Sequence, residues 1–316
     1  MMLLAMILLA APTSEVRLVM GTRAEVQVAG VEDSAAVVDA AFGALDLVDR
    51  SMSLWKESEL IRLNRAGEAR VSPELQAVLE HALEVATASE GAFDPTVEPL
   101  VRATGGFGGA RRRLTSAERE RLLARVGARH VHLDRPNGSV RLDPGTALDL
   151  GGIAKGFAVD LALRALRAAG AESGLVDLGQ SSVSVFGQPL TLEVRNPERP
   201  DSAPWARFEL SEGHVSTSGG DQREDHILDP RTGRPAHRVL SATVIASSAI
   251  EADALSTAVF VLGAERGLAL LERRHAAGFV LRRRRGRAVV EATAGLRSRY
   301  GLEPAAGVVI QERSRP

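Results

Sequence analysis

The chain is organised around one apolar segment near its C-terminal end, Ser247-Ser248-Ala249-Ile250-Glu251-Ala252-Asp253-Ala254-Leu255-Ser256-Thr257-Ala258-Val259-Phe260-Val261-Leu262-Gly263. The segment predicts a single helix, because Ser248 followed three residues later by Glu251 forms a capping-box pattern and Gly263 is a common helix stop. At 100° per residue, apolar side chains occupy nearly every side of this helix. We therefore expect the helix to be buried.

Two polar residues lie on one side of this apolar helix. Asp253 and Thr257 are four residues apart, which places their Cβ atoms about 5–6 Å from each other. A buried carboxylate without partners is costly, so Asp253 needs a compensating group. One interpretation is a backbone hydrogen bond or an arginine partner. The other is a hard cation such as Mg²⁺, which prefers oxygen ligands.

The composition excludes several classes of protein. The 316 residues are 45% hydrophobic and 25% charged, enough for one large globular domain or two small ones. The formal net charge of −1 argues against a general nucleic-acid binder. Because the chain has no cysteine, it has no disulfide, no thiolate metal site and no cysteine-linked lipid anchor. Of its 39 basic residues only Lys56 and Lys155 are lysines, which suggests a need for a compact ammonium group.

The N-terminal segment has the character of an export signal. Met1 to Ala11 is apolar, too short to span a bilayer, and similar to the hydrophobic core of a signal peptide. No Lys or Arg precedes it, so a mis-assigned start or a buried first strand is the alternative. We predict that residues 1–14 are a signal peptide or N-terminal anchor, and that the protein is exported to the periplasm or the outer face of the cell membrane.

Hydrophobic periodicity and turn residues predict an alternation of helices and strands without internal repeats. Helices are expected at 34–50, 72–89, 115–126 and 153–169, with a short helical turn at 58–64. Strands are expected within 15–28 (interrupted at Gly21), at 147–150, 174–187, 190–194, 207–210, 214–216 and 242–246, and in hairpins at 130–142 and 279–290. Residues 91–97, 104–113 and 217–220 are expected to be loops.

A glycine pair, Gly151-Gly152, lies between the predicted strand 147–150 and the helix from Ile153. Strand, glycines and helix N-terminus together are typical of an anion-binding corner. Lys155 in the first helical turn opposes the helix dipole and therefore needs a partner or a ligand. A salt bridge to Asp149 is one alternative, and a bound anion is the other.

Two common nucleotide-binding motifs fail at this corner. Gly151-Gly152-Ile153 breaks the G-x-G-x-x-G pattern at its third position, and Phe157 stands where a P-loop has its lysine. The seven histidines form no H-E-x-x-H pair, and no G-x-S-x-G motif is present. Rossmann-type dinucleotide binding and serine hydrolysis are therefore excluded as leading hypotheses.

Taken together, seven segments in order along the chain resemble the ApbE family of FAD:protein FMN transferases, or flavin transferases. They are Met20-Gly21-Thr22; Met52-Ser53 with Ser58-Glu59-Leu60 and Asn64; Gly91 to Val97 with Pro99-Leu100; Asp149 to Gly156 with Asp160; Thr217-Ser218-Gly219; His226 to Pro230 with Thr232-Gly233; and Asp253 to Thr257.

The resemblance implies one α+β domain over residues 15–316, T-fold-like, with mixed and antiparallel sheets, packed helices and an FAD cleft between two sub-lobes. It further implies Mg²⁺ as cofactor, FAD as substrate, and transfer of the FMN moiety to a Thr or Ser hydroxyl of an acceptor protein, with release of AMP. Family acceptors are flavin-carrying subunits of membrane redox complexes, in agreement with export. An FAD pyrophosphatase and a non-catalytic FAD-binding protein are the alternatives.

The same resemblance assigns roles to individual residues. Asp253 and Thr257 match the metal ligands, joined by a backbone carbonyl of the glycine corner, that of Gly152. Asp149 and Lys155 match FAD contacts, and Lys155 would hold a pyrophosphate oxygen. The segments that line the flavin and adenine pockets correspond to Met20, Trp55, Ala92, Phe93, Asp94 and Ile227. His226 is the candidate general base, since its side chain titrates near neutrality.

The chain also departs from the family pattern. Gln180-Ser181 stands where the family usually has another glycine after Leu178-Gly179, and the segment between Gly219 and His226 is shorter than usual. We expect both differences to reshape the cleft rather than the metal site.

Overall fold

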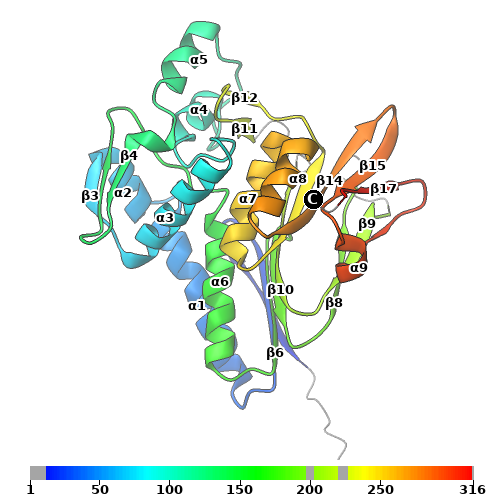
Figure 1. Ribbon diagram of the computed structural model, residues 1–316. Coiled ribbons are helices and arrows are strands. Elements are labelled where there is room, and N and C mark those ends of the chain that lie inside the picture. Colours follow the sequence, from blue (N-terminus) through cyan, green and yellow to red (C-terminus); the bar gives the residue numbers. More distant parts are fainter. Residues whose placement is uncertain (1–11, 197–202, 220–226, 315–316) are drawn as a thin grey trace, which may run out of the picture.

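The computed structural model of the protein describes residues 12–196, 203–219 and 227–314 (Figure 1). Residues 1–11, most of the predicted export segment, lie outside the described residues. Strand β1 begins at Thr13, so the last two residues of that predicted segment belong to the folded sheet. Within the described ranges, no helix is long and apolar enough to cross a membrane.

A nine-stranded sheet runs through the molecule, in the order β1-β2-β6-β7-β10-β13-β14-β15-β17. All neighbouring strands are antiparallel except β15 and β17, which are parallel. The strands are β1 (Thr13–Val19), β2 (Thr22–Ala29), β6 (Ser173–Leu178), β7 (Ser182–Phe186), β10 (Gly213–Gly219), β13 (Ser241–Ala246), β14 (Ala277–Arg284), β15 (Arg287–Ala292) and β17 (Val309–Glu312). Strands from the two halves of the chain thus share one sheet.

The predicted interruption at Gly21 is a tight hairpin turn between β1 and β2. Met20 and Gly21 both have left-handed backbone angles, with φ of 52° and 71°. Two successive left-handed residues match the right-handed twist of the flanking strands. The turn carries the side chain of Met20 to the end of the sheet.

Helices α1 (Ser34–Met52), α6 (Ala154–Ala168) and α7 (Ala249–Leu262) pack side by side against the sheet (Figure 1). Helix α8 (Ala264–Arg273) follows α7 after a left-handed Gly263, with φ of 79°. Helices α2 (Glu59–Ala66) and α3 (Pro73–Ala88) extend this layer. The main hydrophobic core lies between the helices and the sheet, and α7 is buried on nearly all sides, as predicted.

A second core covers the other face of the C-terminal half of the sheet. It lies beneath a three-stranded sheet of β16 (Glu303–Pro304), β9 (Ala206–Leu210) and β8 (Leu190–Val194), together with α9 (Leu296–Tyr300). Phe208 of β9 and Phe279 of β14 meet edge to face, with ring centroids 5.9 Å apart. The mixed α+β architecture predicted from the sequence is therefore confirmed.

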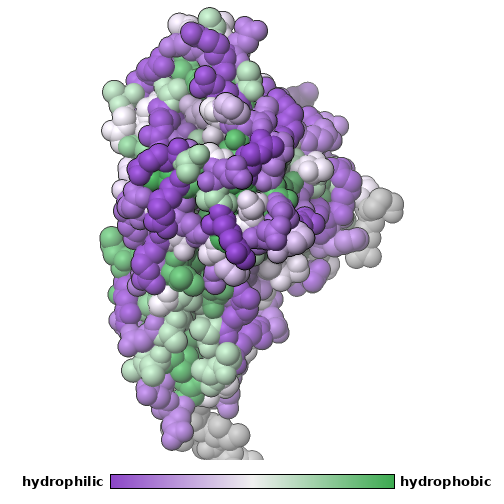
Figure 2. Space-filling model, turned by 90° about the vertical axis from the view of Figure 1, so that its left-hand side faces the viewer, coloured by the Kyte–Doolittle hydropathy of each residue, from purple (hydrophilic) through white to green (hydrophobic). Residues whose placement is uncertain are grey.

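The remaining elements form a smaller region at the top and upper left of Figure 1. It contains the sheet of β3 (Glu68–Arg70), β5 (Ser139–Leu142) and β4 (Val131–Asp134), the short helix η1 (Ala128–His130), helices α4 (Glu98–Ala103) and α5 (Ser116–Leu123), and the ribbon β11 (Leu228–Asp229) with β12 (Arg234–Pro235). In Figure 2 the upper part of the visible face is mainly hydrophilic, whereas hydrophobic side chains gather over its lower part.

Two local predictions are wrong, and helices α4, α8 and α9 were not predicted. Residues 147–150 form no strand, because the side-chain amide of Asn64 donates to Leu148 O (2.8 Å) and accepts from Leu148 N (2.7 Å) in place of a neighbouring strand. Residues 217–219 are not a loop but the end of β10, since pairing with β13 continues to Gly219. The residues after Gly263 form α8, for which no helix was predicted.

The N-terminus of α7 is capped differently from the predicted capping box. Ser248 Oγ accepts from Glu251 N at 3.4 Å, as expected, but the Glu251 carboxylate binds the Arg274 guanidinium at 2.8 and 3.1 Å. The two neighbouring backbone donors, on residues 249 and 250, are satisfied by the carboxylate of Asp160 at 2.8 and 2.9 Å. A carboxylate from α6 thus holds the start of α7, and the reciprocal half of the capping box is wrong.

Candidate active site

A large open cleft of about 2210 Å³ lies where α6, α7 and β10 meet the smaller upper region. Sites for drug-sized ligands are usually about 300–1,000 Å³, so this cleft has room for a dinucleotide and part of a second molecule. Among its lining residues are all the described residues to which a role was predicted: Met20, Trp55, Ala92, Phe93, Asp94, Asp149, Gly152, Lys155, Ile227, Asp253 and Thr257. His226, the candidate base, lies outside the described residues; its neighbour Ile227 lines the cleft.

Asp253 is buried, with 3% of its surface exposed. Its Oδ2 accepts a hydrogen bond from the backbone N–H of Gly156 at 2.9 Å, and its Oδ1 accepts one from Ser216 Oγ at 3.2 Å. The predicted backbone hydrogen bond is therefore present, but none of the described residues forms an ion pair with this carboxylate. A buried carboxylate that retains free lone pairs and lacks a cationic partner suits a bound cation.

The glycine corner reaches the side chain of Thr257. A Cβ added to Gly152 would lie 3.1 Å from Thr257 Oγ1 and 3.3 Å from the Phe93 ring. The corner backbone thus approaches α7 as closely as a glycine allows. Since the described residues contain no cluster of three or more His, Asp or Glu suited to a metal, a cation here would need hydroxyl and carbonyl oxygens besides the one carboxylate.

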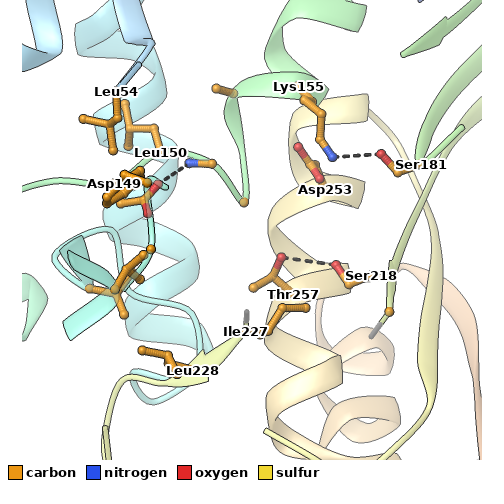
Figure 3. Close-up of a pocket in the computed structure, with 18 of the residues that line it drawn as sticks. Leu54, Asp149, Leu150, Lys155, Ser181, Ser218, Ile227, Leu228, Asp253 and Thr257 are labelled. Carbon is orange, nitrogen blue, oxygen red and sulfur yellow. Dashed lines mark hydrogen bonds between the residues drawn. The ribbon is translucent and has the colours of Figure 1, made fainter. Parts of the chain in front are cut away.

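Lys155 reaches across the cleft floor rather than back to Asp149. Its Nζ donates to Ser181 Oγ at 2.8 Å, so the alternative of a salt bridge to Asp149 is wrong. Asp149 instead accepts from the backbone N–H of Gly151 at 2.7 Å, and desolvation raises the pKa of its carboxyl group. Figure 3 shows Leu54, Asp149 and Leu150 on one wall, opposite Lys155, Asp253 and Thr257.

An aromatic pair stands at the mouth of the cleft. Trp55 is 63% exposed, and its ring meets that of Phe107 edge to face at 5.8 Å. Phe107 has a left-handed φ of 58°, which is uncommon for a side chain of this size. The loop that carries it continues into three exposed arginines that also line the cleft, Arg111, Arg112 and Arg113. The mouth is thus aromatic and positively charged.

Asp94 organises its own loop. Its Oδ1 accepts from Thr96 N (2.9 Å) and Thr96 Oγ1 (2.5 Å), and its Oδ2 accepts from Ala128 N (3.0 Å). Burial raises the pKa of this carboxyl group, while the three hydrogen bonds oppose the rise. These bonds hold the turn that places Ala92 and Phe93 in the cleft wall, so Asp94 shapes the site through the backbone.

The sequence analysis missed two polar residues of the cleft wall, Ser181 and Ser218, and one buried behind it, Ser216. Ser216 and Ser218 of β10 contact Asp253 and Thr257, and Ser181 holds Lys155. The alternation of a strand places residues 216 and 218 on one face, and this signal was lost because the strand was expected to end at 216. Ser181 was noted only as a departure from the family pattern.

The fold and the cleft are those of an α+β ligand-binding protein, with a lysine and a helix N-terminus available to an anionic ligand beside a buried carboxylate. Residues 20–280 match the ApbE family, and the chain belongs to this family.

Relatives of known name agree with this assignment. The chain is 32% identical over 272 residues to an FAD:protein FMN transferase of Klebsiella pneumoniae, covering 78% of this chain and 77% of that protein. It is 34% identical to an FAD:protein FMN transferase of Treponema pallidum, covering 82% and 81%. Among solved structures, the ApbE protein of Thermotoga maritima superimposes with a TM-score of 0.79 at 29% identity (85% and 94% covered). The flavin transferase ApbE of Vibrio cholerae gives 0.80 at 27% identity (91% and 99% covered).

Proposed function

We propose that this protein is an FAD:protein FMN transferase that uses Mg²⁺ to move the FMN moiety of FAD onto a Thr or Ser hydroxyl of an acceptor flavoprotein subunit, with release of AMP. The observation that carries the proposal is the buried Asp253 carboxylate, which lies in the same cleft as Lys155 and the glycine corner and has no cationic partner among the described residues. The names of the curated relatives support the same reaction.

The residues fit a magnesium ion. Asp253, Thr257 and the carbonyl of Gly152 would hold it, because all three offer the oxygen atoms that this ion prefers. Bound there, Mg²⁺ would act as a Lewis acid that neutralises charge on the pyrophosphate.

The chain's own groups would bind and orient the dinucleotide. Lys155 would exchange its hydrogen bond with Ser181 for one to a pyrophosphate oxygen, and the N-terminus of α6 would attract the same negative charge. Trp55, Phe93 and Met20 supply apolar surface for the flavin and adenine rings.

In the reaction, the acceptor hydroxyl oxygen forms a bond to the phosphorus of the FMN half. The bond between that phosphorus and the bridging oxygen breaks, and AMP leaves with the oxygen. The hydroxyl proton passes to a base, for which His226 is the candidate. Positioning of the hydroxyl in line with the leaving group supplies much of the rate enhancement.

Mass spectrometry of the products tests the proposal. The protein is incubated with FAD and a threonine-containing acceptor peptide, with Mg²⁺ or with EDTA. We expect AMP and a peptide that carries FMN, and neither product with EDTA or with Asp253→Asn. Free FMN and AMP beside an unmodified peptide would instead establish an FAD pyrophosphatase, and intact FAD would establish a binding protein.

We further propose that the acceptor is a subunit of a membrane redox complex and that the protein acts on the outer side of the cell membrane. The apolar segment at residues 1–11 supports export. Fractionation of cells that express the full chain tests this, since recovery in the cytoplasm with an intact N-terminus would contradict it.

A further inference from the structure

Two serines of β10 face the two side chains to which we assign the cation. Ser216 Oγ lies 3.2 Å from Asp253 Oδ1, and Ser218 Oγ lies 3.3 Å from Thr257 Oγ1 (Figure 3 shows the second contact). The spacings agree, because two residues along a strand span about 6.6 Å and four residues along a helix span about 6 Å. One face of the strand is thus in register with one face of α7.

The hydroxyl protons near Asp253 can point in only one direction. A hydroxyl has one proton to donate, and an ionised carboxylate can only accept. Ser216 must therefore donate to Asp253 Oδ1. The cross-strand partner Ser182, 3.2 Å away, must then donate to Ser216 Oγ. Both serines are buried, so no bulk water competes for these bonds.

A second chain of hydroxyls determines the direction of the Thr257 proton. Ser256 donates its only proton to the backbone carbonyl of Asp253 at 2.8 Å. Ser218, 2.8 Å from Ser256 Oγ, must therefore donate to it and can only accept from Thr257. Thr257 donates to Ser218, which leaves both lone pairs of Thr257 Oγ1 for another ligand. A neutral hydroxyl binds a cation through such a lone pair.

We propose that Ser216 and Ser218 are positioning residues of the cation site, which turn the oxygen lone pairs of Asp253 and Thr257 toward the cleft. The inference rests on the proposed function, because it needs a cation at these oxygens. Without the Ser216 hydroxyl the Asp253 carboxylate is free to rotate. Without the Ser218 hydroxyl Thr257 is free to point its proton into the site. Side chains that hydrogen-bond to metal ligands in this way typically contribute about 10-fold to 100-fold to metal affinity.

Isothermal titration calorimetry with Mg²⁺ alone provides the test. We expect Ser216→Ala and Ser218→Ala to bind Mg²⁺ at least about 10-fold more weakly than the wild type. Ser218→Thr keeps the hydroxyl and should restore most of the affinity. Thr243→Val is the matched control, since its hydroxyl bonds to Thr217 at 2.9 Å and contacts neither Asp253 nor Thr257.

The melting temperature of each variant, measured in EDTA, separates positioning from folding. If Ser216→Ala does not fold, the partly exposed position 218 still decides the question. Wild-type affinity in both alanine variants, or an equal loss in Thr243→Val, would overturn the inference while the metal site stands. If the wild type itself binds no Mg²⁺, the metal-dependent function fails, and the inference fails with it.

Discussion

Gly156→Ala should push α6 and α7 apart at the centre of the site. A Cβ at this position would lie 2.2 Å from the carbonyl oxygen of Ala249 and 2.8 Å from the Cβ of Asp253. Both atoms belong to the first turns of α7, whose backbone cannot rotate away as a flexible side chain could. The contact is therefore relieved only if the two helices separate.

The change in the free energy of unfolding is the difference between a gain in helix propensity and a loss from overpacking. Gly156 is the third residue of α6, where alanine is favoured over glycine by at most the helix-interior value of about 1 kcal/mol. Overpacking a well-filled core typically costs about 1–3 kcal/mol, and a 2.2 Å contact with backbone belongs at the upper end of that range. We expect the free energy of unfolding to fall by about 2 kcal/mol. Separation of the helices would also lengthen the hydrogen bond from Gly156 N to Asp253, so Mg²⁺ affinity should fall too.

Urea denaturation of the purified variant measures the change, with Gly43→Ala as the control. Gly43 lies in α1, and a Cβ there would meet no atom within 4 Å. This control should gain roughly 0.5–1 kcal/mol, because only the helix-propensity term applies. If Gly156→Ala is stabilised to the same extent, the close approach of α6 to α7 is wrong, and with it the position we assign to Asp253.

Three further predictions concern charged residues, Lys155 in the cleft and two aspartates outside its lining. Lys155→Met should weaken FAD binding by about 10-fold to 100-fold, the worth of a hydrogen bond to a charged group, and fluorescence quenching of FAD measures it. Asp160→Ala should lower the free energy of unfolding by about 1–3 kcal/mol, because two backbone donors of α7 lose their acceptor, and Asp160→Asn should lose less in the same urea titration. The hydrogen bonds from His130 and His132 lower the pKa of Asp143 to about 2. A lowered pKa stabilises the fold above the ordinary value near 4 and loses that effect toward pH 2, so the urea midpoints of wild type and Asp143→Asn should differ at pH 5 and converge below pH 4.

The starts of α3 and α5 were predictable because their main causes are local. Ser72 followed by Pro73 indicated the start of a helix, and Ser72 Oγ accepts from Leu75 N at 3.3 Å at the start of α3. Thr115 forms the capping box of α5 in the same way. Both capping bonds join residues three apart, so the local pattern is enough to predict them, although the Glu59 carboxylate also accepts from Ser72 N and Oγ at 2.6 and 2.7 Å.

The site was predictable in part, for a related reason. Asp253 and Thr257 stood out because polar side chains on an apolar helix need an explanation that the helix cannot supply. The resemblance to the family predicted that Lys155 and the glycine corner belong to the same site as these two residues. The sequence left open whether Lys155 pairs with Asp149, and only the structure shows that it reaches Ser181 of a distant turn.

The sequence by itself thus determined where most of the longer helices begin, the burial of α7 and the family, whereas α4, α8 and α9 were not predicted. Only the tertiary structure decided that residues 147–150 bind a side-chain amide instead of a strand, that β10 continues to Gly219, and that its serines contact Asp253 and Thr257. The physical reason is distance along the chain. The partners of Asp253 and Thr257 on β10 are 37 and 39 residues away, and no local pattern specifies a hydrogen bond that forms only when strand and helix pack together.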